Sequence, residues 1–127
     1  MSTPSLYERL GGTYGISGAV DILVDRLFAN ASVNANEGVH AHHGQAANAP
    51  GYKFLVTAWS IEAAGGPSCY PGLNMTDAHA NLAINADQFD AVAMEIASTL
   101  NFCGVPKAEH DEFMAIIEKL RPEVVRA

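Results

Sequence analysis

The chain has 127 residues, of which 49% are hydrophobic and 17% are charged, and its formal net charge at pH 7 is −7. This length fits a single domain, residues 1–127, which can bury roughly two-thirds of the surface that the unfolded chain exposes. The composition excludes a disordered chain and a disulfide-stapled miniprotein. The acidic balance argues against a nucleic-acid partner, which would need a basic face.

The beginning of the chain shows no targeting signal. The segment MSTPSLYERLGG (1–12) lacks the basic and apolar regions of a signal peptide. No apolar run approaches the roughly 18 residues of a membrane-spanning helix. The two cysteines, Cys69 and Cys103, are too few for a disulfide framework. We therefore expect a reduced, cytoplasmic protein without a membrane partner.

Apolar residues recur at helical spacing in four stretches, 16–27, 52–63, 89–100 and 113–120. The second stretch is followed by Gly65-Gly66-Pro67, and the fourth is expected to stop near Pro122. Alternation with a period of two residues, which would indicate strands, is nowhere sustained. The pattern predicts an all-α fold with four main helices.

Two segments interrupt the helical pattern. Residues 29–51 are rich in Gly, Asn and Ala, and residues 65–74 hold three glycines and two prolines. Both are predicted to be loops. Thr76 is expected to cap a short turn from Asp77 to about Leu82. A long excursion inside a compact helical domain is well explained by a bound cofactor.

The histidines are the main candidates for chemistry. His40, His42 and His43 could bind a transition metal, but no carboxylate or cysteine lies at a matching offset, so a solvated tract is expected. His110 is expected on the surface near the start of the last helix. His79 follows the second break, where residue type alone leaves both a core histidine and a ligand open.

Several motifs together resemble a known family. They are SLYERLGG (5–12), AAGGP (63–67), MTDAH (75–79), QFDAVA (88–93) and CGVP (103–106). In this combination and order they resemble the group I truncated haemoglobins. The resemblance covers the whole chain except about residues 30 to 50.

This resemblance implies a truncated globin-like two-over-two helical sandwich around haem b, in which 14–28 pairs with 52–64 and 88–101 with 109–121. It matches His79 to the proximal histidine that binds the haem iron, with its other ring N–H donating to a backbone carbonyl. It also implies that the haem is lined by apolar side chains of Met75, Leu82, Ile84, Phe89, Val92 and Ile117. Some family members link the haem covalently through a late histidine. No histidine follows His110 here, so we expect non-covalent haem.

The distal side departs from the family pattern. Val24 occupies the position at which many members carry a tyrosine. On the facing helix, where many carry Gln or His, the candidates are Tyr52, Leu55, Val56 and Trp59. We expect a largely apolar distal pocket in which Tyr52 is the only polar group.

An alternative gives the iron a second protein ligand. Lys53 or one of His40, His42 and His43 would then bind the sixth iron position, and the long first loop would act as a mobile arm. Otherwise, Lys53 is expected to pair with a haem propionate at the rim of the pocket.

The resemblance predicts reversible binding of a diatomic gas, O2 and possibly NO or CO, by a monomer or weak dimer. The alternative function is NO dioxygenation, redox or electron-transfer chemistry supported by a reductase. A third hypothesis is a helical bundle without any cofactor.

Overall fold

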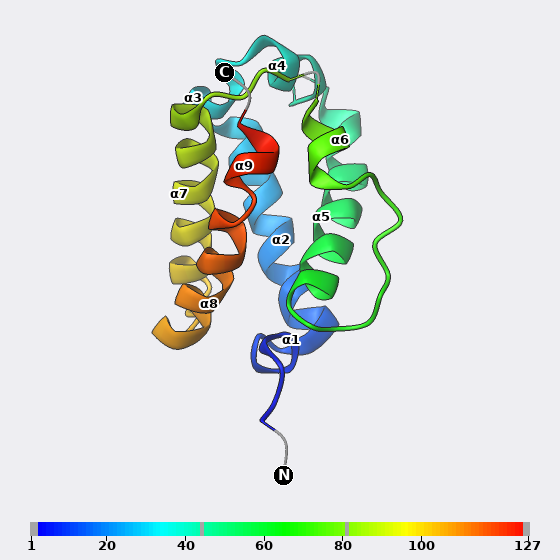
Figure 1. The fold of residues 1–127 in the computed structure, drawn as a ribbon, viewed down its shortest axis with the longest axis vertical. Coiled ribbons are helices and arrows are strands. Elements are labelled where there is room, and N and C mark those ends of the chain that lie inside the picture. Colours follow the sequence, from blue (N-terminus) through cyan, green and yellow to red (C-terminus); the bar gives the residue numbers. More distant parts are fainter. Residues whose placement is uncertain (1–2, 44, 81, 126–127) are drawn as a thin grey trace.

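A computed structural model describes residues 3–43, 45–80 and 82–125 (Figure 1). These ranges contain helices and no strand, which confirms the predicted all-α class. The helices are α1 Leu6–Arg9, α2 Gly12–Ala29, α3 Ala31–Asn34, α4 Glu37–His43, the 3₁₀ helix η1 Ala46–Asn48, α5 Ala49–Ala63, α6 Met75–His79, α7 Ala86–Phe102, α8 Lys107–Glu118 and α9 Arg121–Val124.

The four long helices form two antiparallel pairs. α2 packs against α5, α7 packs against α8, and α2 also contacts α7 to join the pairs (Figure 1). The short helices α3 and α4 lie at one end of the molecule, and α1 lies at the other. α9 lies beside α6. The predicted pairing of the first helix with the second and of the third with the fourth is confirmed.

Local sequence fixes where α5 ends and where α7 begins. Gly65 adopts a φ of +92°, a left-handed conformation that stops α5 two residues earlier. A Cβ on Gly66 would lie 2.6 Å from the Tyr7 ring, so a residue without a side chain is needed here for the turn to pack against α1. Asn85 and Gln88 form a capping box, in which the Asn85 side chain accepts from Gln88 N at 2.8 Å and the Gln88 side chain accepts from Asn85 N at 3.0 Å.

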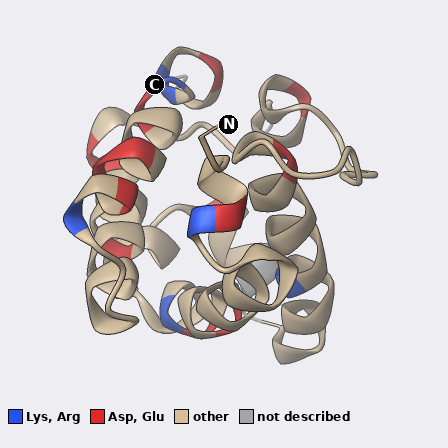
Figure 2. Ribbon diagram, turned by 90° about the horizontal axis from the view of Figure 1, so that it is seen from below, with Lys and Arg blue, Asp and Glu red and all other residues tan. Residues whose placement is uncertain are grey.

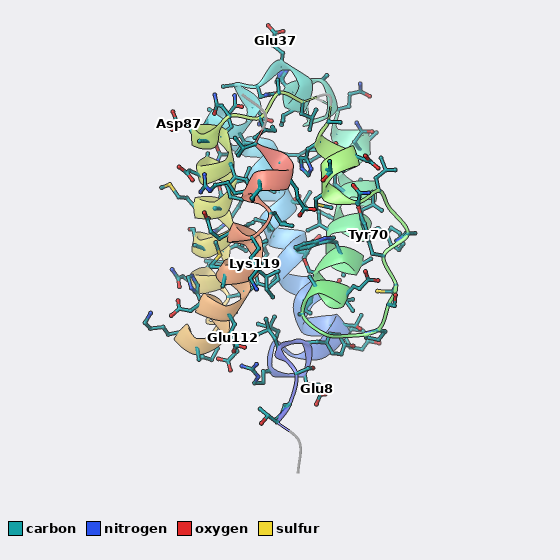
Figure 3. The ribbon with its side chains drawn as sticks, in the orientation of Figure 1. Glu8, Glu37, Tyr70, Asp87, Glu112 and Lys119 are labelled. Carbon is teal, nitrogen blue, oxygen red and sulfur yellow. The ribbon has the colours of Figure 1, made fainter. Side chains whose placement is uncertain are left out.

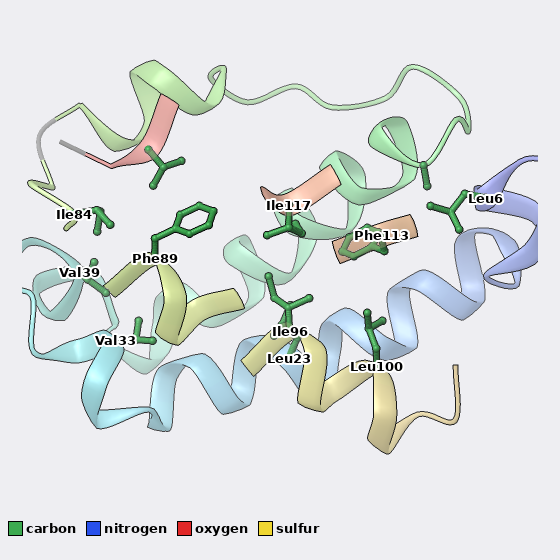
Figure 4. Packing of buried hydrophobic residues seen from close by; sticks show 12 residues of the cluster. Leu6, Leu23, Val33, Val39, Ile84, Phe89, Ile96, Leu100, Phe113 and Ile117 are labelled. Atoms are coloured by element: carbon green, nitrogen blue, oxygen red, sulfur yellow. The ribbon is translucent and has the colours of Figure 1, made fainter. Parts of the chain in front are cut away.

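The core consists of two clusters. The larger draws on all four long helices and on the short elements around them (Figure 4). Its buried members are Leu6, Leu23, Val33, Val39, Ala64, Ile84, Phe89, Ile96, Leu100, Phe113, Ile117 and Val124. The smaller joins α2 to α5 through Ile16, Val20, Val24 and Ile61. Successive residues of α2 therefore serve different clusters, because Leu23 faces the larger one and Val24 the smaller.

The prediction of a loop over 29–51 is wrong. Most of this segment folds into α3, α4 and η1. Asn30 caps α3 by accepting a hydrogen bond from Val33 N at 3.1 Å, and Val33 and Val39 bury their side chains in the larger cluster. Two apolar anchors and a capping asparagine are enough to order short helices that have too few apolar residues to show a periodicity.

Two boundaries also differ from their predictions. The cap of α6 is Asn74, whose side chain accepts from Asp77 N at 2.8 Å, so Thr76 lies inside the helix and the helix ends at His79. α8 already ends at Glu118, and Pro122 sits in the first turn of α9, where the missing N–H of proline costs nothing.

Charged positions are spread over several helices and do not gather in one patch (Figure 2). Glu37 and Asp87 point outward from the first turns of α4 and α7, where a carboxylate complements the helix dipole (Figure 3). Arg9 joins α1 to α8 through ion pairs with Glu109, at 3.3 Å, and with Glu112. No helix among the described residues is long and apolar enough to cross a membrane.

Candidate functional site

His79 is the last residue of α6 and is half-buried. Its Nδ1 lies 2.8 Å from the carbonyl oxygen of Met75, one helical turn earlier. Because a carbonyl can only accept, Nδ1 is the donor in this hydrogen bond, and Nε2 is the ring nitrogen left for a metal. The predicted hydrogen bond to a backbone carbonyl is thus confirmed, and it holds the imidazole in the tautomer that a metal requires.

The loop between α5 and α6 fixes the direction from which α6 approaches. Tyr70 donates through its hydroxyl to Leu73 O at 2.6 Å, and Glu62 accepts from Ser68 Oγ at 3.0 Å and from Tyr70 N at 3.3 Å (Figure 3). Burial raises the pKa of Tyr70, so its hydroxyl remains a donor at neutral pH. These contacts hold a stretch without helix in one path that ends at the cap of α6.

Eight of the apolar residues predicted to line a haem belong to the larger cluster or pack against it. Ile84, Phe89 and Ile117 are buried members of the larger cluster (Figure 4). Val56, Trp59, Met75, Leu82 and Val92 pack against the same cluster but remain partly exposed. The structure therefore brings together residues from α5, α6, α7, α8 and the segment after His79.

This arrangement fits a haem. Large apolar side chains that stay half-exposed beside a buried cluster offer surface for a flat apolar group to cover. His79 supplies the donor atom that haem iron takes from a protein, a neutral imidazole nitrogen whose partner nitrogen is engaged by a carbonyl.

The predicted distal residues divide into two groups. Val24, only 1% exposed, lies in the smaller cluster between α2 and α5, with Tyr52 and Val56 packed against it. Tyr52 meets Phe28 edge to face, with ring centroids 5.6 Å apart, and burial raises the pKa of the phenol. Leu55 is 36% exposed and belongs to neither cluster. Tyr52 and Val56 are thus the candidates that border the α2–α5 interface.

Lys53 connects α5 to α2 at the exposed edge of this interface. Its Nζ lies 2.8 Å from an Asp21 carboxylate oxygen and 3.0 Å from one of Asp25, both on α2. These hydrogen bonds raise the pKa of Lys53, so the amine stays protonated and has no lone pair for a metal. Its engagement by two carboxylates supports neither the role of an iron ligand nor that of a propionate partner.

The histidine tract lies on α4. His40 is exposed, and the side chains of His42 and His43 lie outside the described part of the structure. α4 is docked through Val39, which is 8% exposed, so the mobile arm of the alternative with a histidine ligand is instead a packed helix. In the described ranges, no group of three His, Cys, Asp or Glu side chains could hold a metal ion.

His110 is less exposed than predicted. Its side chain retains 18% of its exposure in the first turn of α8, with Nδ1 lying 3.3 Å from Asp111 Oδ1. Its Nε2 is buried with no hydrogen-bond partner among the described atoms. His110 therefore meets the exposed Asp111 through Nδ1, as expected of a surface residue, but its Nε2 edge is buried.

The sequence analysis missed Asn36. This residue is 8% exposed, and its side chain reaches the backbone of Leu82 and Ala83, directly after the α6 turn. The available signal was an asparagine placed just before Glu37-Gly38-Val39, which is typical of a helix cap. Nothing in the sequence pattern indicates the second set of contacts.

A cavity of about 510 Å³ borders the larger cluster on the side of α2 and α7. Leu23, Ile96, Leu100 and Phe113 line the cavity and belong to the cluster as well. Gly15 and Gly18 of α2 also line it. Apolar space therefore adjoins the core next to the second helix pair.

The family model described as "Bacterial-like globin" matches residues 5–126. The chain belongs to the bacterial-like globin family. Within it, the chain is 28% identical to the group 1 truncated haemoglobin of Tetrahymena pyriformis over 121 residues, which are 95% of this chain and 94% of that protein. It is 32% identical to a group 1 truncated haemoglobin of a Synechocystis species, over 84% of this chain and 82% of the other.

Solved structures agree with the sequence matches. The crystal structure of the Tetrahymena pyriformis truncated haemoglobin, in its Fe(III) form, aligns with a TM-score of 0.81 at 28% identity, over 98% of this globin and 100% of that chain. A 2/2 haemoglobin of a Synechococcus species, described as having covalently attached haem, aligns with a TM-score of 0.77 at 26% identity, over 96% and 98% of the two chains. The predicted family and two-over-two fold are confirmed, and the family implies a haem.

Proposed function

We propose that this globin holds haem b non-covalently through His79 and reversibly binds a diatomic gas, O2 with NO or CO as alternatives. The observation that carries the proposal is the 2.8 Å hydrogen bond from His79 Nδ1 to Met75 O, which orients the ring and leaves Nε2 as a ligand. Haem iron held in this way supplies an open coordination position for the gas.

The chain's own residues enclose the cofactor. On the side of His79 we assign Met75, Leu82, Ile84, Phe89, Val92 and Ile117 to the haem wall, and on the opposite side Val24, Tyr52, Leu55, Val56 and Trp59. Their side chains exclude water, because all of them except Tyr52 and Trp59 are without polar groups. Non-covalent attachment is supported by the sequence, in which no histidine follows His110.

Tyr52 is the hydroxyl donor in the proposed distal set. Burial raises the pKa of its phenol, so the group stays protonated at neutral pH and can donate to a gas ligand that carries partial negative charge. Neither Lys53, which is paired with Asp21 and Asp25, nor the exposed His40 has a contact that favours it as an iron ligand. The side chains of His42 and His43, the other two candidates, lie outside the described part of the structure. We propose that the gas, and none of these side chains, would bind the remaining position of the haem iron.

The test compares absorption spectra of the wild-type protein, His79→Ala and the control His40→Ala, each reconstituted with haem. We expect a Soret band in the wild type and in His40→Ala, and weak, altered haem binding in His79→Ala. In the ferrous state without added ligand, one broad visible band is expected from the wild type. A wild-type spectrum from His79→Ala would overturn the assignment, and no Soret band in the wild type would overturn haem binding altogether.

A further inference from the structure

The side chain of Asn36 connects the segment 30–48 to the chain that follows His79. Its Nδ2 donates to Leu82 O at 2.6 Å and also lies 3.4 Å from Ala83 O. Its Oδ1 accepts from Val39 N at 3.0 Å and so caps α4. One buried amide therefore uses its two ends for two tasks, a helix cap and a contact with residues 46 and 47 positions further along the chain.

Hydrogen bonds lead from this contact to the imidazole. Leu82 N donates to His79 O at 3.1 Å, and His79 Nδ1 donates to Met75 O at 2.8 Å. Leu82 therefore accepts a hydrogen bond from Asn36 through its carbonyl and donates one to the His79 carbonyl through its N–H. Bonds in series of this kind fix the direction of the group at their end, because each restrains the next peptide.

Packing reinforces the same junction. A Cβ on Gly38 would lie 3.0 Å from Leu82 Cδ2 and 3.4 Å from Leu82 Cα, so α4 approaches this residue closely. Gln88, which belongs to the capping box of α7, lies 3.3 Å from Asn36 Nδ2 through its Oε1. Asn36 therefore sits where α4, the segment after His79 and the start of α7 meet.

We propose that Asn36 is a positioning residue for the His79 imidazole, so that segment 30–48 acts on the proximal side of the site. This inference rests on the proposed function of His79 as the haem ligand. Loss of the Asn36 donor leaves the Leu82 carbonyl without this hydrogen bond. The backbone after His79 then becomes more mobile, and the imidazole can turn about its hydrogen bond to Met75 O.

The test uses Asn36→Asp, which keeps the oxygen that caps α4 but replaces the amide donor by a carboxylate oxygen facing two carbonyls. Asn36→Ser is the uncharged second variant, since serine also caps helices but cannot reach Leu82. The matched control is Asn34→Asp. Asn34 lies on α3 and donates its amide to Phe28 O at 2.9 Å and to Leu27 O at 3.4 Å, both at the end of α2.

Two readouts are measured on the full chain. Hydrogen exchange of the backbone amides in 79–85 should be about two- to tenfold faster in both Asn36 variants and unchanged in Asn34→Asp. The iron–histidine stretching band in the resonance Raman spectrum of the ferrous haem-loaded protein should shift in the Asn36 variants only. Unchanged readouts, or equal changes in the control, would overturn the inference.

The two proposals fail separately. If the wild type binds no haem, no iron–histidine band can be recorded and the proposed function is lost, but hydrogen exchange still decides whether Asn36 restrains 79–85. If haem binds through His79 and its band does not respond to Asn36, the proposed function stands and the positioning role is refuted.

Discussion

Ala83 adopts a φ of +51°, and it is the one non-glycine residue with positive φ in the described part of the chain. It is exposed, so its methyl group contributes little to packing. Because a Cβ in the left-handed conformation crowds the following carbonyl, replacement by glycine should relieve strain. We predict that Ala83→Gly raises the free energy of unfolding.

The expected size follows from two opposing contributions. A non-glycine residue in the left-handed region costs about 1–2 kcal/mol, and the greater freedom of glycine in the unfolded chain costs about 0.5–1 kcal/mol. Taking the middle of each range, the net gain is about 0.75 kcal/mol. With an entropy of unfolding of about 2.1 cal/mol/K per residue, or about 0.27 kcal/mol/K for this length, Tm should rise by about 3 °C.

The assay is thermal unfolding of the wild type, Ala83→Gly and the control Ala115→Gly, all at equal haem loading because a bound ligand also raises Tm. Ala115 is exposed like Ala83 but lies inside α8. Glycine there should lower Tm by about 4 °C, since it loses about 1 kcal/mol of helix propensity. A fall in Tm for Ala83→Gly comparable to that of Ala115→Gly would refute the argument from strain.

Three further outcomes are expected. Tyr52→Phe should speed O2 dissociation about two- to thirteenfold in stopped-flow measurements, because it removes a hydrogen bond worth about 0.5–1.5 kcal/mol, and Tyr70→Phe should not. Phe89→Ala, at a site 6% exposed in the larger cluster, should lower the free energy of unfolding in a urea titration by about 3–5 kcal/mol; a loss below about 1 kcal/mol would contradict its core role. Arg9 holds the pKa of Glu112 below its ordinary 4.5, so that pair stabilises the fold above this pH and its contribution is lost as the pH falls through the lower, folded-state value. Arg9→Met should therefore reduce the loss of Tm on acidification, and an unchanged pH profile would count against the pairing.

The parts of the fold that the sequence predicts are those with a strong local signal. The stripes in 16–27, 52–63, 89–100 and 113–120 each fall within a helix or run a little past its end, and the glycines at 65 and 66 mark the turn after α5. The hydrogen bond of His79 to a backbone carbonyl was predicted from the resemblance to the truncated haemoglobins, and the structure identifies the acceptor as Met75 O, four residues earlier.

The segment 29–51 could not be predicted because its order comes from contacts distant in sequence. α3 and α4 each contribute one buried valine, Val33 and Val39, which is too few for a detectable period. Lys53 shows the same limit. A lysine near the start of a helix over a proposed cofactor fits several roles, and only Asp21 and Asp25, on another helix, decide that its ammonium is held on the outer side.

The order of segment 30–48 has a consequence for both sides of the proposed haem. Asn34 donates to the carbonyl of Phe28, whose ring lies 5.6 Å from that of Tyr52, the proposed distal donor. Asn36, two residues later, donates to Leu82, which follows the proposed iron ligand His79 by three residues. Two asparagines on one short stretch thus connect it to the end of α2 and to the chain after α6. A segment predicted to be a loop therefore bridges the two parts of the chain that carry proposed haem contacts.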